Sequence, residues 1–445
     1  MNRISQCIFL IFGLCTPLLG QQSLSLEEAL EIGISNSIDV EIAKINQRIA
    51  TNNNTLKAAG QHPTITASLT NSNVLLSQNN PASFIGDARI LSNSIDGNVD
   101  VAVSIYDGNR IQINKSIFEL QQALSNLGVD QSIEQVILNV LSAYYQAQIQ
   151  KEQLQTFDEV LKLSEDRIEY QEIRKEFGQS GTFDLLQSQD ALLNDSTNYL
   201  VTLNNYKTAI RSLKLAMGDI DSETDYDVSD PLDFDPKIYR ENELVSRSAD
   251  RNFTLQSLKV NEKIAISQIN FQKSFRKPTL SLNGGVNLGL VGTDLSGSIP
   301  GTNEPFTYTL GNSYGPYVNL AARYTISDGG NINRSVENAE LEARIAQLDI
   351  QNQKRNLTIQ VQNALAEYNN QLNLIALAEN LLDNARNNLQ IAEERFKAAQ
   401  INSFDYRSIQ LSYINANLTR LSAIFNLKMS GMEIERLTGD LVNYQ

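Results

Sequence analysis

The chain has 445 residues and a formal net charge of −15 at pH 7, with 41% hydrophobic and 20% charged residues. This composition excludes a disordered chain and a bundle of membrane helices, and the length exceeds that of one ordinary core. The acidic balance also argues against nucleic acid as a partner, because phosphate binding needs a basic face.

Residues 1–20 have the pattern of a secretory signal. Arg3 supplies a positive start, residues 8–14 an apolar stretch, and Gly20 a small residue at a cleavage site, so we expect the mature chain to begin near Gln21. The alternative is a membrane anchor, which needs about 20 apolar residues and therefore a longer run than this one.

Both cysteines, Cys7 and Cys15, lie inside the expected signal. The mature chain should then have no thiol for disulfides, redox chemistry or metals. Lipidation at Cys15 is disfavoured because Leu14 stands where a lipoprotein signal needs a small residue. No later run approaches 18 apolar residues, which excludes a helical membrane span and leaves membrane-spanning strands open.

More than half of the net charge lies in residues 219–235, which hold eight carboxylates and no Lys or Arg. With Pro231 inside it, this segment is typical of a solvated linker, and cation binding is the alternative.

An internal repeat organises the chain. Asp107-Gly108 recurs 221 residues later as Asp328-Gly329, whereas Pro63 recurs as Pro278 at an offset of 215. We therefore predict a signal peptide (1–20), a first repeat (21–218), an acidic or equatorial linker (219–240), a second repeat (241–440) and a short tail (441–445).

Each repeat is expected to begin with a helix, over 24–60 and 241–276, which ends before a proline. Two strands with alternating apolar residues follow in each repeat. Their apolar positions are Ile65, Ala67 and Leu69; Val99, Val101, Val103 and Ile105; Leu280, Leu282, Val286, Leu288 and Leu290; and Val318, Leu320, Ala322, Tyr324 and Ile326. The connecting loops are expected at about 76–94 and 293–312.

Asp107-Gly108 and Asp328-Gly329 mark strand-to-helix junctions, where each aspartate would cap the next helix. No proline interrupts residues 108–176, and apolar residues recur there at spacings of three and four. The same pattern after Asp328 predicts a second long helix, and returning helices are expected over 184–217 and 405–437. Seams of this length favour coiled-coil packing.

Ten tilted residues of strand span roughly 24 Å, the height of an outer-membrane apolar band. Four strands cannot close a barrel, which needs about eight, but three chains would supply twelve. The chain has no Trp, so an interfacial aromatic belt would consist of Tyr106, Tyr314, Tyr317 and Tyr324. A soluble β-sandwich shows the same alternation and is the alternative.

In the order of these parts, the mature chain resembles the TolC-like outer-membrane efflux proteins. The resemblance rests on the duplicated unit, the Asp-Gly junctions, the Pro-Thr strand starts and the phrases "FGQSGTFDLLQ" and "FKAAQINSFDYRSIQ". It implies a mixed α and β fold in which a homotrimer forms a 12-stranded outer-membrane barrel, four strands per chain, above a coiled-coil helical barrel in the periplasm. It also implies a closed tip that is opened by a periplasmic adaptor and an inner-membrane pump of the RND or ABC type.

The resemblance further implies a periplasmic gate at Asp184 and Asp405, the aspartates after each tip turn, and at Phe177 and Phe396 before them. Three copies of a carboxylate around one axis would repel one another and attract cations, although each Asp could simply cap its helix. The chain departs from the family at Ser408, where a second aspartate is common, and near Gln400, where an arginine is usual. The expected adaptor contacts are Gly178, Gln179, Ser180, Gly181, Thr182, Gln400, Asn402 and Ser403.

Catalysis is disfavoured. The one histidine, His62, precedes a proline without a metal cluster, nucleophile or phosphate loop beside it, so no cofactor, metal or catalytic residue is expected. The chain would then be a passive conduit for small molecules or proteins, in efflux or type I secretion. The alternative is a secreted structural or adhesive coiled-coil protein, which would not need four strands of membrane-spanning length.

Overall fold

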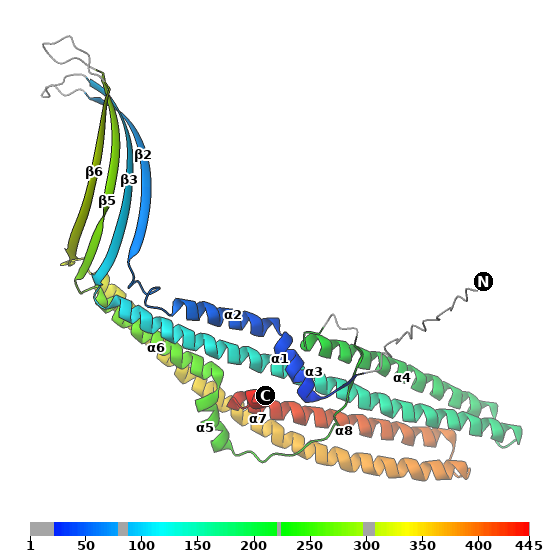
Figure 1. Cartoon of the computed structure of the whole chain (residues 1–445). Helices are drawn as coiled ribbons and strands as arrows, with labels where there is room; N and C mark the ends of the chain where they lie inside the picture. Colours follow the sequence, from blue (N-terminus) through cyan, green and yellow to red (C-terminus); the bar gives the residue numbers. More distant parts are fainter. Residues whose placement is uncertain (1–21, 79–87, 220–223, 297–307, 445) are drawn as a thin grey trace, which may run out of the picture. The chain divides into compact units, whose positions relative to one another are not determined.

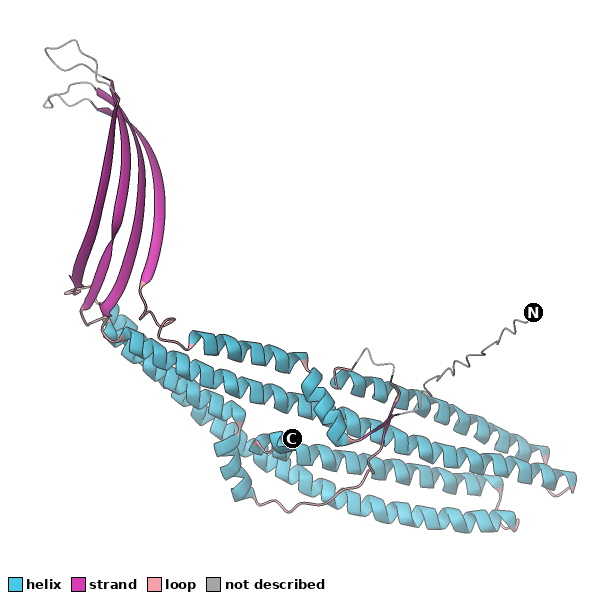
Figure 2. Ribbon diagram, viewed as in Figure 1, coloured by secondary structure: helices cyan, strands magenta, loops and turns pink. Residues whose placement is uncertain are grey.

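The computed structural model describes residues 22–78, 88–219, 224–296 and 308–444, and the expected signal peptide lies outside them. The chain divides into two compact units, with residues 1–43, 129–255 and 354–445 in the first and residues 44–128 and 256–353 in the second. Helices and strands are both present (Figure 2).

The second unit contains one four-stranded sheet. Its strands are β2 (Thr64–Gln78), β3 (Ala88–Tyr106), β5 (Thr279–Ser296) and β6 (Thr309–Arg323). They lie in the order β2-β3-β5-β6, every pair antiparallel, and Figure 1 shows them side by side. The strands β2 and β6 therefore form the two edges.

The two faces of this sheet differ in polarity. Leu69, Gly97, Leu288 and Tyr314 lie in one cross-strand row, and all three large side chains of the row are exposed. The next row on the opposite face is Thr70, Asp96, Gly289 and Ser313. One face is thus apolar and open, and the other is polar, which is the alternation of a strand between lipid and water.

The strands are longer than the sequence predicts. Asn73 pairs with Asn93 and Leu75 with Leu91, so the polar segment expected as a loop continues the ladder. In contrast, β6 ends at Arg323, and the expectation that Tyr324 and Ile326 belong to it is wrong. The reason is that β5 starts directly after Pro278, so residues beyond Arg323 have no partner in β5.

The helices expected over 24–60 and 241–276 are each broken in two. The observed helices are α1 (Leu26–Asn36) with α2 (Ile38–Asn53), and α5 (Glu241–Arg251) with α6 (Phe253–Ser274). At the first break Ser37 Oγ accepts from Val40 N at 3.3 Å, and at the second Asn252 Oδ1 accepts from Leu255 N at 3.1 Å. Each polar residue caps the helix that follows, and this local bond competes with a continuous helix.

Two long hairpins follow the strands. They consist of α3 (Arg110–Glu176) with α4 (Thr182–Ala216), and α7 (Asn331–Lys397) with α8 (Ser403–Thr438), and the 3₁₀ helix Leu441–Tyr444 ends the chain. At the strand-to-helix junctions, Asp107 Oδ2 accepts from Ile111 N at 2.8 Å and Asp328 Oδ2 accepts from Ile332 N at 2.6 Å. Gly108 adopts a φ of 78°, and a Cβ there would lie 2.7 Å from Ser274 O, so only glycine fits.

The acidic segment after α4 is packed rather than solvated. Its strand β4 (Tyr226–Val228) pairs in parallel with β1 (Gln22–Leu24). The Asp230 carboxylate lies 2.8 Å from both the Tyr144 hydroxyl and Leu26 N. Apolar residues alternate with the carboxylates in this segment, and Tyr226, Val228 and Leu232 are buried. The expectation of a wholly solvated linker is therefore wrong.

Among the described helices, none is both long and apolar enough to cross a membrane.

The ends of α4 and α8 dock against the two helix breaks. Gly218 and Gly439 adopt positive φ values of 67° and 69°. A Cβ would lie 3.0 Å from Asn36 O at Gly218 and 2.6 Å from Arg251 O at Gly439. Both contacts belong to the first unit, and they fix where each returning helix stops.

Gly439→Ala should destabilise the protein more than Gly178→Ala. Both glycines have a φ of 69°, but a Cβ meets nothing within 4 Å at Gly178. The left-handed conformation alone should cost about 1–2 kcal/mol in either variant, and the clash with Arg251 O should add about 1–3 kcal/mol at Gly439 only. Thermal unfolding of the two purified variants checks this, and equal losses would contradict the close approach.

Candidate functional site

Two turns form the ends of the helical hairpins, and they share a backbone path. The first turn, residues 177–181, joins α3 to α4, and the second, residues 398–402, joins α7 to α8. Gly178 and Ala399 occupy equivalent places with positive φ values of 69° and 58°. The alanine tolerates this conformation less readily than a glycine, because its Cβ crowds the backbone.

The aspartates of the two turns have different surroundings. Asp184 Oδ2 accepts from Gly181 N at 3.3 Å and from Ser180 Oγ at 3.3 Å, so this carboxylate caps α4 from inside its first turn. In the second turn Asn402 provides the cap, because its Oδ1 accepts from Asp405 N at 2.8 Å. Among the described residues the Asp405 carboxylate has no hydrogen-bond partner, and its residue is exposed. The simple capping role therefore applies to Asp184 and not to Asp405.

A polar cavity of about 290 Å³, which we call the tip hollow, lies beside the second turn, between that turn and the neighbouring ends of α3 and α4. Five of the residues singled out in the sequence line it: Asp184, Gln400, Asn402, Ser403 and Asp405. The other four residues that line the tip hollow were not predicted from the sequence: Gln171, Arg174, Ala399 and Ile401. The hollow thus brings two carboxylates and one guanidinium together.

The structure separates the two phenylalanines proposed for the gate. Phe177 is 75% exposed, whereas Phe396 is 3% exposed. The Phe396 ring stacks on Tyr406 with the centroids 5.0 Å apart and lies 5.2 Å from Tyr170. The Tyr170 hydroxyl donates to Lys397 O at 2.8 Å. Phe396 is therefore part of the packed interior of the tip, and of these two phenylalanines Phe177 alone presents an exposed ring.

A partly buried ion pair links the two hairpins. Arg407 on α8 binds Asp195 on α4 with both terminal nitrogens, at 2.7 and 2.6 Å. Asp195 is fully buried and also accepts from Ser164 Oγ of α3 at 2.6 Å. A two-pronged bond of this kind is strong and directional, so it fixes the position of α8 relative to the first hairpin.

A second arginine, Arg167 on α3, lies near the same carboxylate. It is 3% exposed, and its three guanidinium nitrogens have no hydrogen-bond partner among the described residues. Burial and then the charge of Arg407 lower the pKa of Arg167, while Asp195 raises it. One buried and one partly buried cation thus lie near a single buried anion, and Arg407 holds both of its oxygens.

The sequence contained a sign of this polar layer. The buried seam of α3 runs through Phe157 and Val160 and then turns polar at Ser164, Arg167 and Gln171, at spacings of three and four. A polar residue on such a seam is expensive unless it has a partner, which marks the layer as a feature to explain. Among the other predicted residues, Ser408 is exposed on α8.

The described residues hold no group of three or more His, Cys, Asp and Glu side chains that could bind a metal ion.

Comparison with solved structures gives the same fold. The Campylobacter jejuni CmeC outer membrane channel matches with a TM-score of 0.72 at 17% identity, over 93% of this chain and 85% of that one. The Neisseria gonorrhoeae MtrE outer membrane channel, in its open state, matches with a TM-score of 0.69 at 17% identity, over 94% and 89%. VceC from Vibrio cholerae matches with a TM-score of 0.68 at 11% identity, over 93% and 96%.

The expectation of a mixed α and β fold of the TolC-like type is therefore confirmed. No curated protein sequence matches the chain significantly. The profile of the family described as "Outer membrane efflux protein" matches residues 30–219 and again residues 244–439. Because these two matches cover most of the sequence, the chain belongs to the outer membrane efflux protein family, and it is a protein of the bacterial outer membrane with its helical part in the periplasm.

Proposed function

We propose that three copies of the chain form one passive conduit through the outer membrane. The observation that carries this proposal is the four-stranded sheet, which has one exposed apolar face and two edges, β2 and β6, that no other described strand pairs with. If β2 of one copy pairs with β6 of the next, three copies close a barrel of twelve strands, with the apolar face toward lipid and the polar face toward the lumen.

Exposed apolar seams on the helices support the same assembly. Leu186, Leu193 and Leu200 recur at every seventh residue along α4, and all three are exposed. On α7 the exposed residues Leu374, Leu377 and Leu381 follow at spacings of three and four. Figure 1 shows α4 and α7 at the two sides of the layer formed with α3 and α8. Such seams are typical of coiled-coil partners, so α4 of one copy would pack on α7 of the next.

We further propose that the two hairpins derive from a duplicated unit, over residues 21–218 and 241–440, and that residues 1–20 are removed before assembly. The matched helix breaks at Ser37 and Asn252 support the duplication. Because the family's channels are conduits, the energy for export would come from an inner-membrane pump of the RND or ABC type. A periplasmic adaptor would connect that pump to the tip, at residues 178–182 and 400–403.

The tip would be the gate of this conduit. Three tip hollows would meet around one axis, each with Asp184 and Asp405, and their carboxylates would repel one another and attract cations. Phe177 is an exposed ring at the same end. MtrE, which shares the fold, has an open state, and an open state here would require the two hairpins of each copy to separate at the Asp195–Arg407 pair.

We expect the chain to assemble as a trimer. The mature chain extracted from outer membranes in mild detergent should have about three times the mass of one chain, by native mass spectrometry or light scattering. Leu193→Glu should reduce the trimer fraction because it places a charge in the α4 seam. Asn194→Glu adds the same charge on the next exposed position and should leave the trimer intact. A soluble monomer would instead favour the adhesive coiled-coil protein.

We expect the carboxylates of the tip to make the channel prefer cations over anions. Asp405→Asn should lower the preference for cations over anions, read as a reversal potential in a planar bilayer. Asp184→Asn should lower it too, and it should also destabilise the start of α4 because the cap is weakened. Ser408→Asp should raise the preference. Unchanged reversal potentials in all three variants would show that these carboxylates do not face the pore.

We expect the Asp195–Arg407 ion pair to stabilise the closed tip. Asp195→Asn leaves the buried Arg167 and the partly buried Arg407 without a counter-charge, whereas Arg407→Leu leaves Asp195 with Arg167. We therefore expect Asp195→Asn to cost on the order of 3–5 kcal/mol in the stability of the closed tip, and Arg407→Leu to cost less. Both should raise single-channel conductance and hydrogen exchange in 160–171 and 403–410.

The double variant Asp195→Leu with Arg407→Leu is the control, since it removes both charges of the pair. It should open the tip less than Asp195→Asn does. If Arg407→Leu proves the more damaging single change, Arg167 does not serve as a second partner for Asp195.

A further inference from the structure

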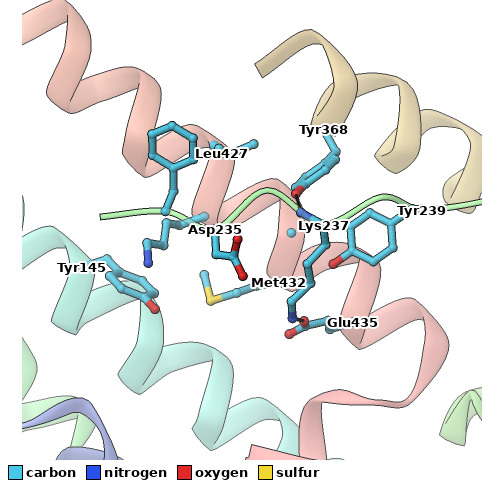
Figure 3. Close-up of a pocket in the computed structure, with 11 residues that line it drawn as sticks. Tyr145, Asp235, Lys237, Tyr239, Tyr368, Leu427, Met432 and Glu435 are labelled. Carbon is cyan, nitrogen blue, oxygen red and sulfur yellow. Dashed lines mark hydrogen bonds and ion pairs between the residues drawn. The ribbon is translucent and has the colours of Figure 1, made fainter. Parts of the chain in front are cut away.

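A second polar cavity lies far from the tip residues, in the middle of the first unit. It has a volume of about 190 Å³ and lies between residues 234–239, which lead from the acidic segment to α5, and the helices α3, α7 and α8 (Figure 3). Lys237 N donates to the Tyr368 hydroxyl at 2.9 Å, and Lys237 Nζ forms an ion pair with Glu435 at 2.7 Å. Tyr239 packs edge-on against Tyr368, with the centroids 5.0 Å apart. The walls are thus held in place by their own contacts.

One wall carries the ammonium group of Lys428, which donates no hydrogen bond to any described residue. Lys428 on α8 is half-buried, with Nζ 4.9 Å from the centroid of the Tyr145 ring. Among the described residues it has no ion pair and no hydrogen-bond acceptor. Burial lowers the pKa of Lys428, and the charges of Asp233 and Asp230 raise it. An ammonium group carries three donors, and those of Lys428 are available to an acceptor inside the cavity.

The opposite charge lines the same cavity. Asp235 belongs to the segment that covers the cavity, and Figure 3 shows its carboxylate above Met432, in the space between Tyr145 and Lys237. Among the described residues Asp235 has no ion-pair partner, and it does not pair with Lys428. A cation and an anion thus face one small space without neutralising each other.

The remaining walls are aromatic or apolar. They include Tyr145, Phe234, Tyr239, Tyr368 and Met432. Tyrosine faces attract cations, and burial raises the pKa of Tyr145 to about 12, which keeps its hydroxyl neutral. A water molecule takes about 30 Å³ in the liquid, so the cavity has room for roughly six non-hydrogen atoms.

We infer that this cavity binds a small zwitterion of the amino-acid class. The carboxylate of the ligand accepts hydrogen bonds from Lys428, and its ammonium group binds Asp235 and the tyrosine faces. Both unused charges of the protein are then paired, and the size of an amino acid such as alanine suits the volume. A bound zwitterion would connect α8 to the acidic segment. The inference concerns this cavity alone and does not rest on the proposed channel assembly.

The test uses the full mature protein in detergent and radiolabelled alanine in equilibrium dialysis. We expect saturable binding of one alanine per chain, displaced by excess unlabelled glycine or alanine. Propionate and ethylamine, which each carry only one of the two charges, should displace it at least tenfold less well. Equal competition by propionate alone would overturn the zwitterion, and the absence of saturable binding would overturn the site.

Variants locate the binding. Lys428→Met and Asp235→Asn should each weaken alanine binding at least tenfold, while Lys263→Met, at an exposed lysine of α6, should leave it unchanged. Asp235 is exposed on an irregular segment, so Asp235→Asn decides the question even if Lys428→Met does not fold. Unchanged binding in Asp235→Asn would overturn the inference.

Discussion

The backbone hydrogen bonds that β2 and β6 leave unmade constrain the rest of this molecule. Each of these strands has a neighbour on one side only. Lipid offers no partner for a peptide group, and each unpaired group there costs several kcal/mol. Among the described residues no fifth strand covers either edge, so in a membrane the sheet needs further copies of itself. Twelve strands from three copies would meet this need, and the proposed assembly would also bring α4 of one copy against α7 of the next.

The two halves of the chain meet the same geometric requirements with different residues. Gly178 and Ala399 both adopt the left-handed conformation at the tip turns, although only the first is a glycine. The helices after the two turns are capped in opposite directions. At α4 the side chain of Asp184 accepts from the backbone N–H of the earlier Gly181, whereas at α8 the side chain of Asn402 accepts from the N–H of the later Asp405. As a result Asp405 is released from the capping role that Asp184 performs. A trimer would therefore have only a pseudo-sixfold tip, with two unlike sets of three carboxylates.

Local signals predicted most of the fold. Asp107 and Asp328 each cap a helix that begins three residues later, so the information lies within about one helical turn of the chain. The alternation of apolar and polar residues likewise located all four strands of the sheet. The first and last residues of each strand depend on its pairing with the neighbouring strand, which the sequence does not reveal. The helix breaks were missed because Ser37 and Asn252 fall inside periodic stretches, where a polar residue is also compatible with a solvent-facing position.

The site was less predictable, because its central contact joins distant residues. Asp195 and Arg407 are 212 residues apart, and periodicity alone does not name the partner of a charged residue on a seam. In the sequence, Phe177 and Phe396 both stand just before a tip turn, so the pattern predicts the same role for both. Only packing distinguishes them, since Tyr406 and Tyr170 cover the second ring and nothing comparable covers the first.

The buried pair of Asp195 and Arg407 is a poor choice for stability alone. Replacing such a pair with well-packed apolar residues is often neutral or stabilising, but opening an apolar contact exposes its surface to water, which is unfavourable. An ion pair is specific in the closed position, and each partner becomes easier to hydrate as the interface opens. Arg167 adds a second property, because it would offer Asp195 a partner on its own hairpin if Arg407 moved away. One carboxylate between two arginines would thus define two arrangements of the proposed gate, one that joins the hairpins and one that does not, and a gate needs both.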